Sequence, residues 1–161
     1  MALNRLKTHQ KIFLFSVLAV ALIAIFDIWS MNSGVFGTIE NYISGNYTPG
    51  WWTLFFKINI AFLVLISVFY YFFVRKDFSE SVSFFVSSTI LWFTGLSDIF
   101  FFLFRRLPVS QTLDWLNNHI VIGKVTILLG FSDVTSTALF ISTFLGLIIS
   151  YCITKILVEK F

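Results

Sequence analysis

Two short polar motifs interrupt apolar stretches of the chain, and each ends in a carboxylate. Gly95 to Asp98 reads Gly-Leu-Ser-Asp, and Gly130 to Asp133 reads Gly-Phe-Ser-Asp. A carboxylate in an apolar segment can hold a cation or a proton, contact a partner helix, or share a proton with a second carboxylate and activate water. Asp98 and Asp133 are therefore the candidate catalytic pair.

Two further ionisable residues and a tryptophan complete the candidate ligand-binding set. Asp27, Lys57, Asp98 and Asp133 occur one to an apolar segment and near the same end of each segment. We expect them to form one polar layer that holds a cation, a small ligand or a partner helix. Trp92 could line such a pocket, although an aromatic side chain within an apolar segment more often fills the core.

Structural roles compete with these functional ones. Asp133 could be a first-turn carboxylate that the helix dipole favours. Asp27 lies close enough to a segment end to be solvated, and Lys57 could extend its ammonium group outward to the headgroups. Asp98 is followed by the apolar run Ile-Phe-Phe-Phe-Leu-Phe, so it needs a partner, and an Asp98–Lys57 pair is the structural alternative.

His119 is the candidate metal ligand, together with Asp114 or Asp133. A lone histidine on an amphipathic segment is more often an interface residue. Cys152 is the only cysteine, which excludes an internal disulfide, a cysteine metal cluster and paired-cysteine oxidoreductase chemistry. No particular cofactor is indicated.

The elements that position these residues follow from composition. Of the 161 residues, 58% are hydrophobic and 12% are charged, whereas a soluble domain carries about 25% charged residues. The sequence therefore predicts an integral membrane protein with the lipid bilayer as its main partner. It contains no basic stripe or motif typical of nucleic-acid binding.

Four segments are long and apolar enough to cross a bilayer as helices. They run over residues 12–31, 53–74, 82–104 and 134–157, and a short polar loop joins the second to the third. An interfacial amphipathic helix is expected over residues 110–125, with Ser110 as its N-cap. The predicted fold is a single all-α domain over residues 1–161, a four-helix transmembrane bundle.

Basic residues predict the orientation. If the chain starts inside, seven Lys and Arg residues lie on the inner side and four on the outer side, which favours cytoplasmic termini. The inner set is Arg5, Lys7, Lys11, Arg75, Lys76, Lys155 and Lys160, and the outer set is Lys57, Arg105, Arg106 and Lys124.

Small polar residues recur at helical spacing within two of the segments, so each set shares one face. Small residues at that spacing permit close helix packing in a membrane. The two sets are Ser83, Ser87, Thr94 and Asp98 in the third segment, and Ser142, Gly146 and Ser150 in the fourth.

Three functions fit this pattern. The chain could be a binding or transport component with an outward-facing anionic pocket, or a non-catalytic subunit of a homo-oligomer or larger membrane complex. It could also be an intramembrane hydrolase that uses Asp98 and Asp133. Four spans and two aspartates near the outer end are similar to the topology of the lipoprotein signal peptidases, but the Asn-x-x-Asp and Ala-Asp-type motifs of that family do not surround Asp98 or Asp133.

Overall fold

The computed structural model describes residues 6–32, 51–113, 116–117 and 119–160. In these residues the regular secondary structure is helical apart from one isolated antiparallel bridge between Thr112 and Thr135, and turns and irregular segments connect the helices. The helices run in chain order as follows: α1 (Thr8–Asn32), α3 (Trp51–Phe69), the π-helix η2 (Tyr70–Arg75), α4 (Phe78–Phe93), α5 (Leu96–Arg105), α6 (Ile122–Leu128) and α7 (Ser136–Lys160). The all-α class predicted from the sequence is confirmed.

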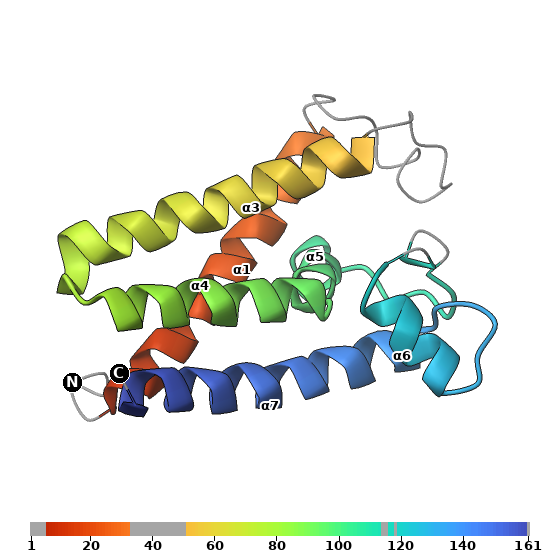
Figure 1. The fold of residues 1–161 in the computed structure, drawn as a ribbon. Helices are drawn as coiled ribbons and strands as arrows, with labels where there is room; N and C mark the ends of the chain where they lie inside the picture. The colour runs from red at the N-terminus through yellow and green to blue at the C-terminus, as the bar shows by residue number, and fades with distance from the viewer. Residues whose placement is uncertain (1–5, 33–50, 114–115, 118, 161) are drawn as a thin grey trace.

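The long helices lie side by side, and α1 crosses α4 and α7 obliquely (Figure 1). The start of α1 and the end of α7 lie together at one end, which we call the termini end. Helices α5 and α6 lie at the opposite end, which we call the break end. Within the described residues, three helices are long and apolar enough to cross a membrane, and the number rises to four if α4 and α5 count as one span.

The expected third span is not one straight helix, and this prediction is corrected. Helices α4 and α5 meet at 66° across Thr94 and Gly95. Gly95 has φ = 94°, a left-handed conformation that glycine adopts at little cost. The space that a Cβ atom would need at Gly95 is occupied by the ends of Leu139 and Ile122. The chain therefore turns where only glycine fits.

Helices α4 and α7 pack closely through small polar residues. Ser87 Oγ lies 2.5 Å from Ser150 Oγ, and Thr143 Oγ1 donates to the Thr94 carbonyl at 2.9 Å. A Cβ atom on Gly146 would collide with the Thr94 side chain. The small-residue face of the fourth segment thus packs against the end of α4, and Thr143 supplies a donor to a carbonyl beside the helix break.

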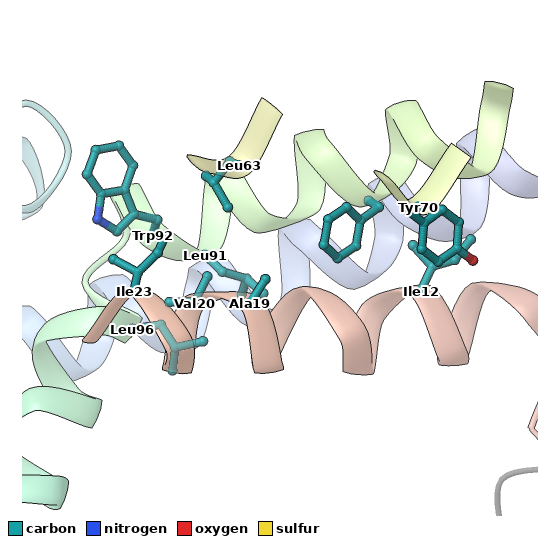
Figure 2. Packing of buried hydrophobic residues seen from close by; sticks show 10 residues of the cluster. Ile12, Ala19, Val20, Ile23, Leu63, Tyr70, Leu91, Trp92 and Leu96 are labelled. Carbon is teal, nitrogen blue, oxygen red and sulfur yellow. The ribbon is translucent and has the colours of Figure 1, made fainter. Parts of the chain in front are cut away.

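The apolar core joins α1, α3 and α4 (Figure 2). Its buried side chains include Ile12, Val20 and Ile23 from α1, Leu63 from α3 and Leu91 from α4. The outward faces of the long helices are rich in exposed Phe, Leu and Ile, for example Phe73, Leu65 and Phe144 at 64–75% exposure. This distribution suits helices surrounded by lipid.

The expected interfacial helix over residues 110–125 is also corrected. Leu113 N donates to the Val134 carbonyl at 2.8 Å, and Ser136 N donates to the Gln111 carbonyl at 3.3 Å. These backbone bonds hold the segment against the start of α7, and among its described residues the only α-helix is α6, which begins at Ile122 and ends at Leu128. Leu113 and Leu116 are buried as an amphipathic pattern would require, but Ile120 is 71% exposed.

Candidate functional site

Polar side chains near the termini end are paired with one another or with backbone. Ser16 Oγ donates to the Ile12 carbonyl at 3.0 Å, and Ser81 Oγ donates to the Ser67 carbonyl at 2.6 Å. Tyr70 donates to Glu80 at 3.1 Å. Together with the Ser87–Ser150 contact, these bonds satisfy this half of the bundle internally.

Five buried side-chain atoms elsewhere have no hydrogen-bond partner among the described residues. They come from four helices: Asp27 Oδ1 of α1, Asn59 Nδ2 of α3, Ser88 Oγ and Thr89 Oγ1 of α4, and Ser142 Oγ of α7. Each such group costs about 1–3 kcal/mol if it stays unpaired, and more if it is charged. Bound water, an ion or a ligand is a common partner for such groups in native proteins.

The helix register places the α3, α4 and α7 atoms in one zone that extends about 10 Å along the bundle, from Ser88 to the helix break, and we call this zone the polar layer. The contacts Ser87–Ser150 and Thr94–Thr143 lie seven residues apart on both α4 and α7, so the two helices run antiparallel in a constant register. In this register Ser142 lies opposite Gly95, at the helix break. Two contacts define the register of α3 against α4. Ser81 donates to the Ser67 carbonyl near one end, and the rings of Phe56 and Trp92 are in contact near the other. By that register Asn59 is level with Thr89.

Asp27 is the centre of this layer. Its side chain is only 7% exposed, and its carboxyl lies within electrostatic range of Asp98 and of the Asn59 amide. The contact to Asn59 falls short of a well-formed hydrogen bond, because Asp27 Oδ1 and Asn59 Nδ2 both lack a partner. The Asp27 carboxyl of α1 is therefore coupled electrostatically to a carboxyl group of α5 and lies near an amide of α3.

The helix break determines where Asp98 lies. Asp98 is half-buried in the first turn of α5, and α5 begins at Gly95 without a side-chain cap. The positive end of the helix dipole favours a carboxylate there. On a straight helix Asp98 would share a face with Ser87 and Thr94 against α7. After the 66° bend it belongs to α5, which packs on α1, the helix of Asp27.

The structure does not bring Lys57 or Asp133 into this cluster. The Lys57 side chain is exposed on α3. Asp133 is exposed in the loop before α7, where Oδ1 accepts from Asn117 at 3.2 Å and Oδ2 accepts from Ser132 at 2.9 Å. The carboxyl group that interacts electrostatically with Asp98 is that of Asp27, and the expected pairing of Asp98 with Asp133 stays a prediction.

Trp92 is a core residue at the edge of the same layer. It is 9% exposed, and its ring lies 5.5 Å from that of Phe56 and 5.1 Å from that of Phe93. Figure 2 shows it at the end of the apolar cluster, above Ile23 and Leu96. Its ring contacts with Phe56 and Phe93 make it part of the apolar core beside the layer.

His119 belongs to the connection between α5 and α6. Its ring lies 6.2 Å from the Phe93 ring, and Nδ1 accepts from Ile122 N at 3.4 Å. Among the described residues no three His, Cys, Asp or Glu side chains are grouped to hold a metal ion. Asp114, one of its two expected co-ligands, lies outside the described residues, and Asp133 has the partners given above.

Burial of His119 makes stability depend on pH. Burial lowers the pKa of His119 from 6.5 to about 4. As pH falls, His119 is therefore protonated in the unfolded chain at a higher pH than in the folded protein. The favourable contribution of the neutral ring is complete above the unfolded pKa of about 6.5 and is lost progressively below it. We expect about 1–3 kcal/mol less stability at pH 4.5 than at pH 7.5 from this residue.

Thermal unfolding of the wild type and His119→Gln at these two pH values checks this expectation. Carboxylates titrate alike in both proteins, so the difference between the two pH dependences isolates His119. Identical pH dependence in the two proteins would show that His119 is already solvated in the folded state.

Asn59 is the site residue that the sequence analysis missed. It is 1% exposed and sits between Ile58 and Ile60 in an apolar span. An amide at such a position needs a partner just as a carboxylate does. This requirement could have identified Asn59 from the sequence, but Asn59 is not ionisable and was therefore not among the candidates.

No protein-family model, no curated protein and no solved structure matches this chain. Its chemistry is therefore read from its own residues. Those residues give an interior layer of oxygen-rich side chains at a helix break, with Asp27 and Asp98 as its charged members.

Proposed function

We propose that this chain is a small multi-pass membrane protein that binds a small cation, the proton included, between Asp27 and Asp98, as a binding or transport component. The observation that carries the proposal is the buried Asp27 carboxyl, which has an unpartnered oxygen and interacts electrostatically with Asp98 and the Asn59 amide. A proton or a metal cation between the two carboxyl groups would offset their mutual repulsion.

The surrounding groups suit a hard cation. Carboxylate, amide and hydroxyl oxygens are the ligands that such cations prefer, and Asn59 and Ser142 supply the last two kinds. A broken helix beside the site is also how several membrane transporters expose backbone groups to an ion. Thr94 and Gly95 provide such a break next to Asp98.

The positive-inside rule assigns the termini end to the cytoplasm, and the cation layer then lies toward the outer face. In this orientation the exposed apolar faces contact lipid or a partner helix. A homo-oligomer or a larger complex remains part of the proposal, with the Asp27–Asp98 layer as the functional centre of each chain.

Cation-dependent stability of Asp98→Asn tests the proposal. A ligand that binds only the folded state stabilises it by about 2.7 kcal/mol at one hundred times its Kd. We expect one of Na⁺, K⁺, Li⁺, Mg²⁺, Ca²⁺ or H⁺ to raise the unfolding temperature of the wild type above that in N-methylglucamine at equal ionic strength. Asp98→Asn should weaken this binding at least a hundredfold and thus lose most of the shift.

Asp133→Asn is the matched control, because it removes a carboxylate of the same type from an exposed loop. It should retain the full cation effect. If no cation or pH change stabilises the wild type, or if Asp98→Asn responds as the wild type does, the cation site is wrong.

A hydrolase is the second candidate, and the proximity of Asp27 to Asp98 is the feature that favours it. The pair proposed for catalysis thereby changes from Asp98 and Asp133 to Asp27 and Asp98. An aspartic dyad shares one proton and activates water. Cleavage of membrane-embedded peptides by the wild type, and by neither Asp27→Asn nor Asp98→Asn, would favour this candidate over transport.

A further inference from the structure

A second cluster of titratable side chains lies at the termini end, far from the Asp27 layer along the bundle. His9, in the first turns of α1, is only 5% exposed. Tyr151 OH of α7 lies 3.3 Å from His9 Nε2, and Glu159 Oε1 of α7 lies 3.5 Å from His9 Nδ1. The imidazole therefore has a phenol on one ring nitrogen and a carboxylate on the other.

The three side chains differ in their access to water. The Glu159 side chain is 51% exposed, whereas that of His9 is 6% exposed and Tyr151 is half-buried. The Phe13 ring packs edge-on against Tyr151 at 5.4 Å and covers the phenol from the other side. The cluster thus runs from solvent at Glu159, through His9, to Tyr151 in the helix interface.

Histidine in such a position can pass protons. Its ordinary pKa lies near neutrality, and it can take a proton on one ring nitrogen while it releases one from the other. Here Tyr151 would donate its O–H proton to Nε2 as it accepts one from the next hydroxyl or water, and Nδ1 would release a proton to the Glu159 carboxylate. Only O–H and N–H bonds form and break, and the imidazole ends neutral.

Small hydroxyl side chains lie on the α4–α7 interface between this cluster and the Asp27 layer. Tyr151 follows Ser150, whose hydroxyl contacts Ser87 across the α4–α7 interface. Ser88 lies next to Ser87, and its hydroxyl is one of the unpartnered buried groups, as is that of Ser142. A hydroxyl both donates and accepts hydrogen bonds, so such a series, joined by water, can conduct a proton.

We propose that His9, Tyr151 and Glu159 form a proton-exchange site at the termini end, and that the cation bound between Asp27 and Asp98 is a proton that reaches this site along the α4–α7 hydroxyl groups. This inference rests on the proposed function and names its ligand. The competing role for the cluster is a purely structural tie between α1 and α7.

Proton flux into liposomes separates the two roles. The full-length protein is reconstituted with an internal pH-sensitive dye, and a potassium diffusion potential drives protons inward. Wild-type protein should acidify the interior faster than empty liposomes. His9→Gln should slow the protein-dependent flux at least tenfold, and Tyr151→Phe should slow it several-fold while the ring that packs on Phe13 is kept.

Tyr71→Phe is the matched control, since Tyr71 lies in η2 at the same end of the bundle and makes its ring contact with Phe72. It should conduct as the wild type does. Thermal unfolding of every variant before reconstitution identifies any that fails to fold, and Glu159→Gln at the exposed position then replaces His9→Gln as the test.

The results distinguish failure of the inference from failure of the proposed function. Loss of flux in His9→Gln, Tyr151→Phe and Asp98→Asn supports the proton route. Flux that Asp98→Asn abolishes but His9→Gln and Tyr151→Phe retain overturns the exchange site and leaves the cation site intact. Asp98-dependent uptake of Na⁺ or another metal ion without proton flux overturns the proton assignment alone. Flux of no cation overturns the inference and transport together.

Discussion

Asp27→Asn is expected to make the protein more stable and to abolish its cation binding. Asparagine keeps the shape of the side chain and removes an ionisable carboxyl group that is 7% exposed and interacts electrostatically with Asp98. Because an imperfectly paired buried charge is unfavourable, its removal should raise the free energy of unfolding by about 1–2 kcal/mol in the absence of bound cation.

This direction is informative because most substitutions destabilise, typically by about 1 kcal/mol. A substitution that stabilises the fold and eliminates binding marks a group that is retained for function at a cost in stability. The cation-dependent increase in stability of the wild type, about 2.7 kcal/mol at one hundred times Kd, should be absent in the variant.

Unfolding in mixed detergent micelles, with and without the stabilising cation, measures both effects. Asp133→Asn is the control and should change stability by no more than about 0.5 kcal/mol, as exposed substitutions do. A clearly destabilised Asp27→Asn that still responds to the cation would assign Asp27 to packing and remove it from the site.

The largest loss of stability is expected from Gly95→Ala. A methyl group at Gly95 would lie 2.3 Å from Leu139 Cδ1 and 3.0 Å from Ile122 Cδ1, and both side chains are fully buried. The residue also has φ = 94°. Left-handed strain of about 1–2 kcal/mol and overpacking of about 1–3 kcal/mol add to an expected loss of about 2–5 kcal/mol.

Gly130→Ala separates these two causes. Gly130 has φ = 77°, but nothing lies within 4 Å of the position of its added Cβ atom. It should therefore lose only the strain, about 1–2 kcal/mol. Thermal unfolding of both variants in the same detergent gives the comparison. Equal losses would mean that the helix break is not held by Leu139 and Ile122.

The sequence by itself determined the helical class, the presence of several apolar segments long enough to span a membrane, and the small-residue face of the fourth segment. These follow from local composition and from helical periodicity, which depend little on distant contacts. Ser87, Ser150 and Gly146 pack as their spacing predicts, because a straight helix keeps one face in one direction.

The tertiary structure decided which charged residues meet. Gly95 turns α5 away from α4, so Asp98 lies near Asp27 and not on the face of Ser87 and Thr94. The spacing of residues does not show whether a glycine continues a helix or breaks it. That outcome depends on Leu139 and Ile122, which fill the space beside it from distant parts of the chain.

Asp133 and Leu113 show the same limit. The pattern of Leu113 and Leu116 predicted an amphipathic helix, but backbone bonds to Val134 and Ser136 hold that segment against the start of α7. The Asp133 carboxylate accepts hydrogen bonds from Asn117 and Ser132. Local propensity sets what a segment can form, and long-range hydrogen bonds and packing select among the alternatives, which is why the polar layer at Asp27 emerged only from the folded chain.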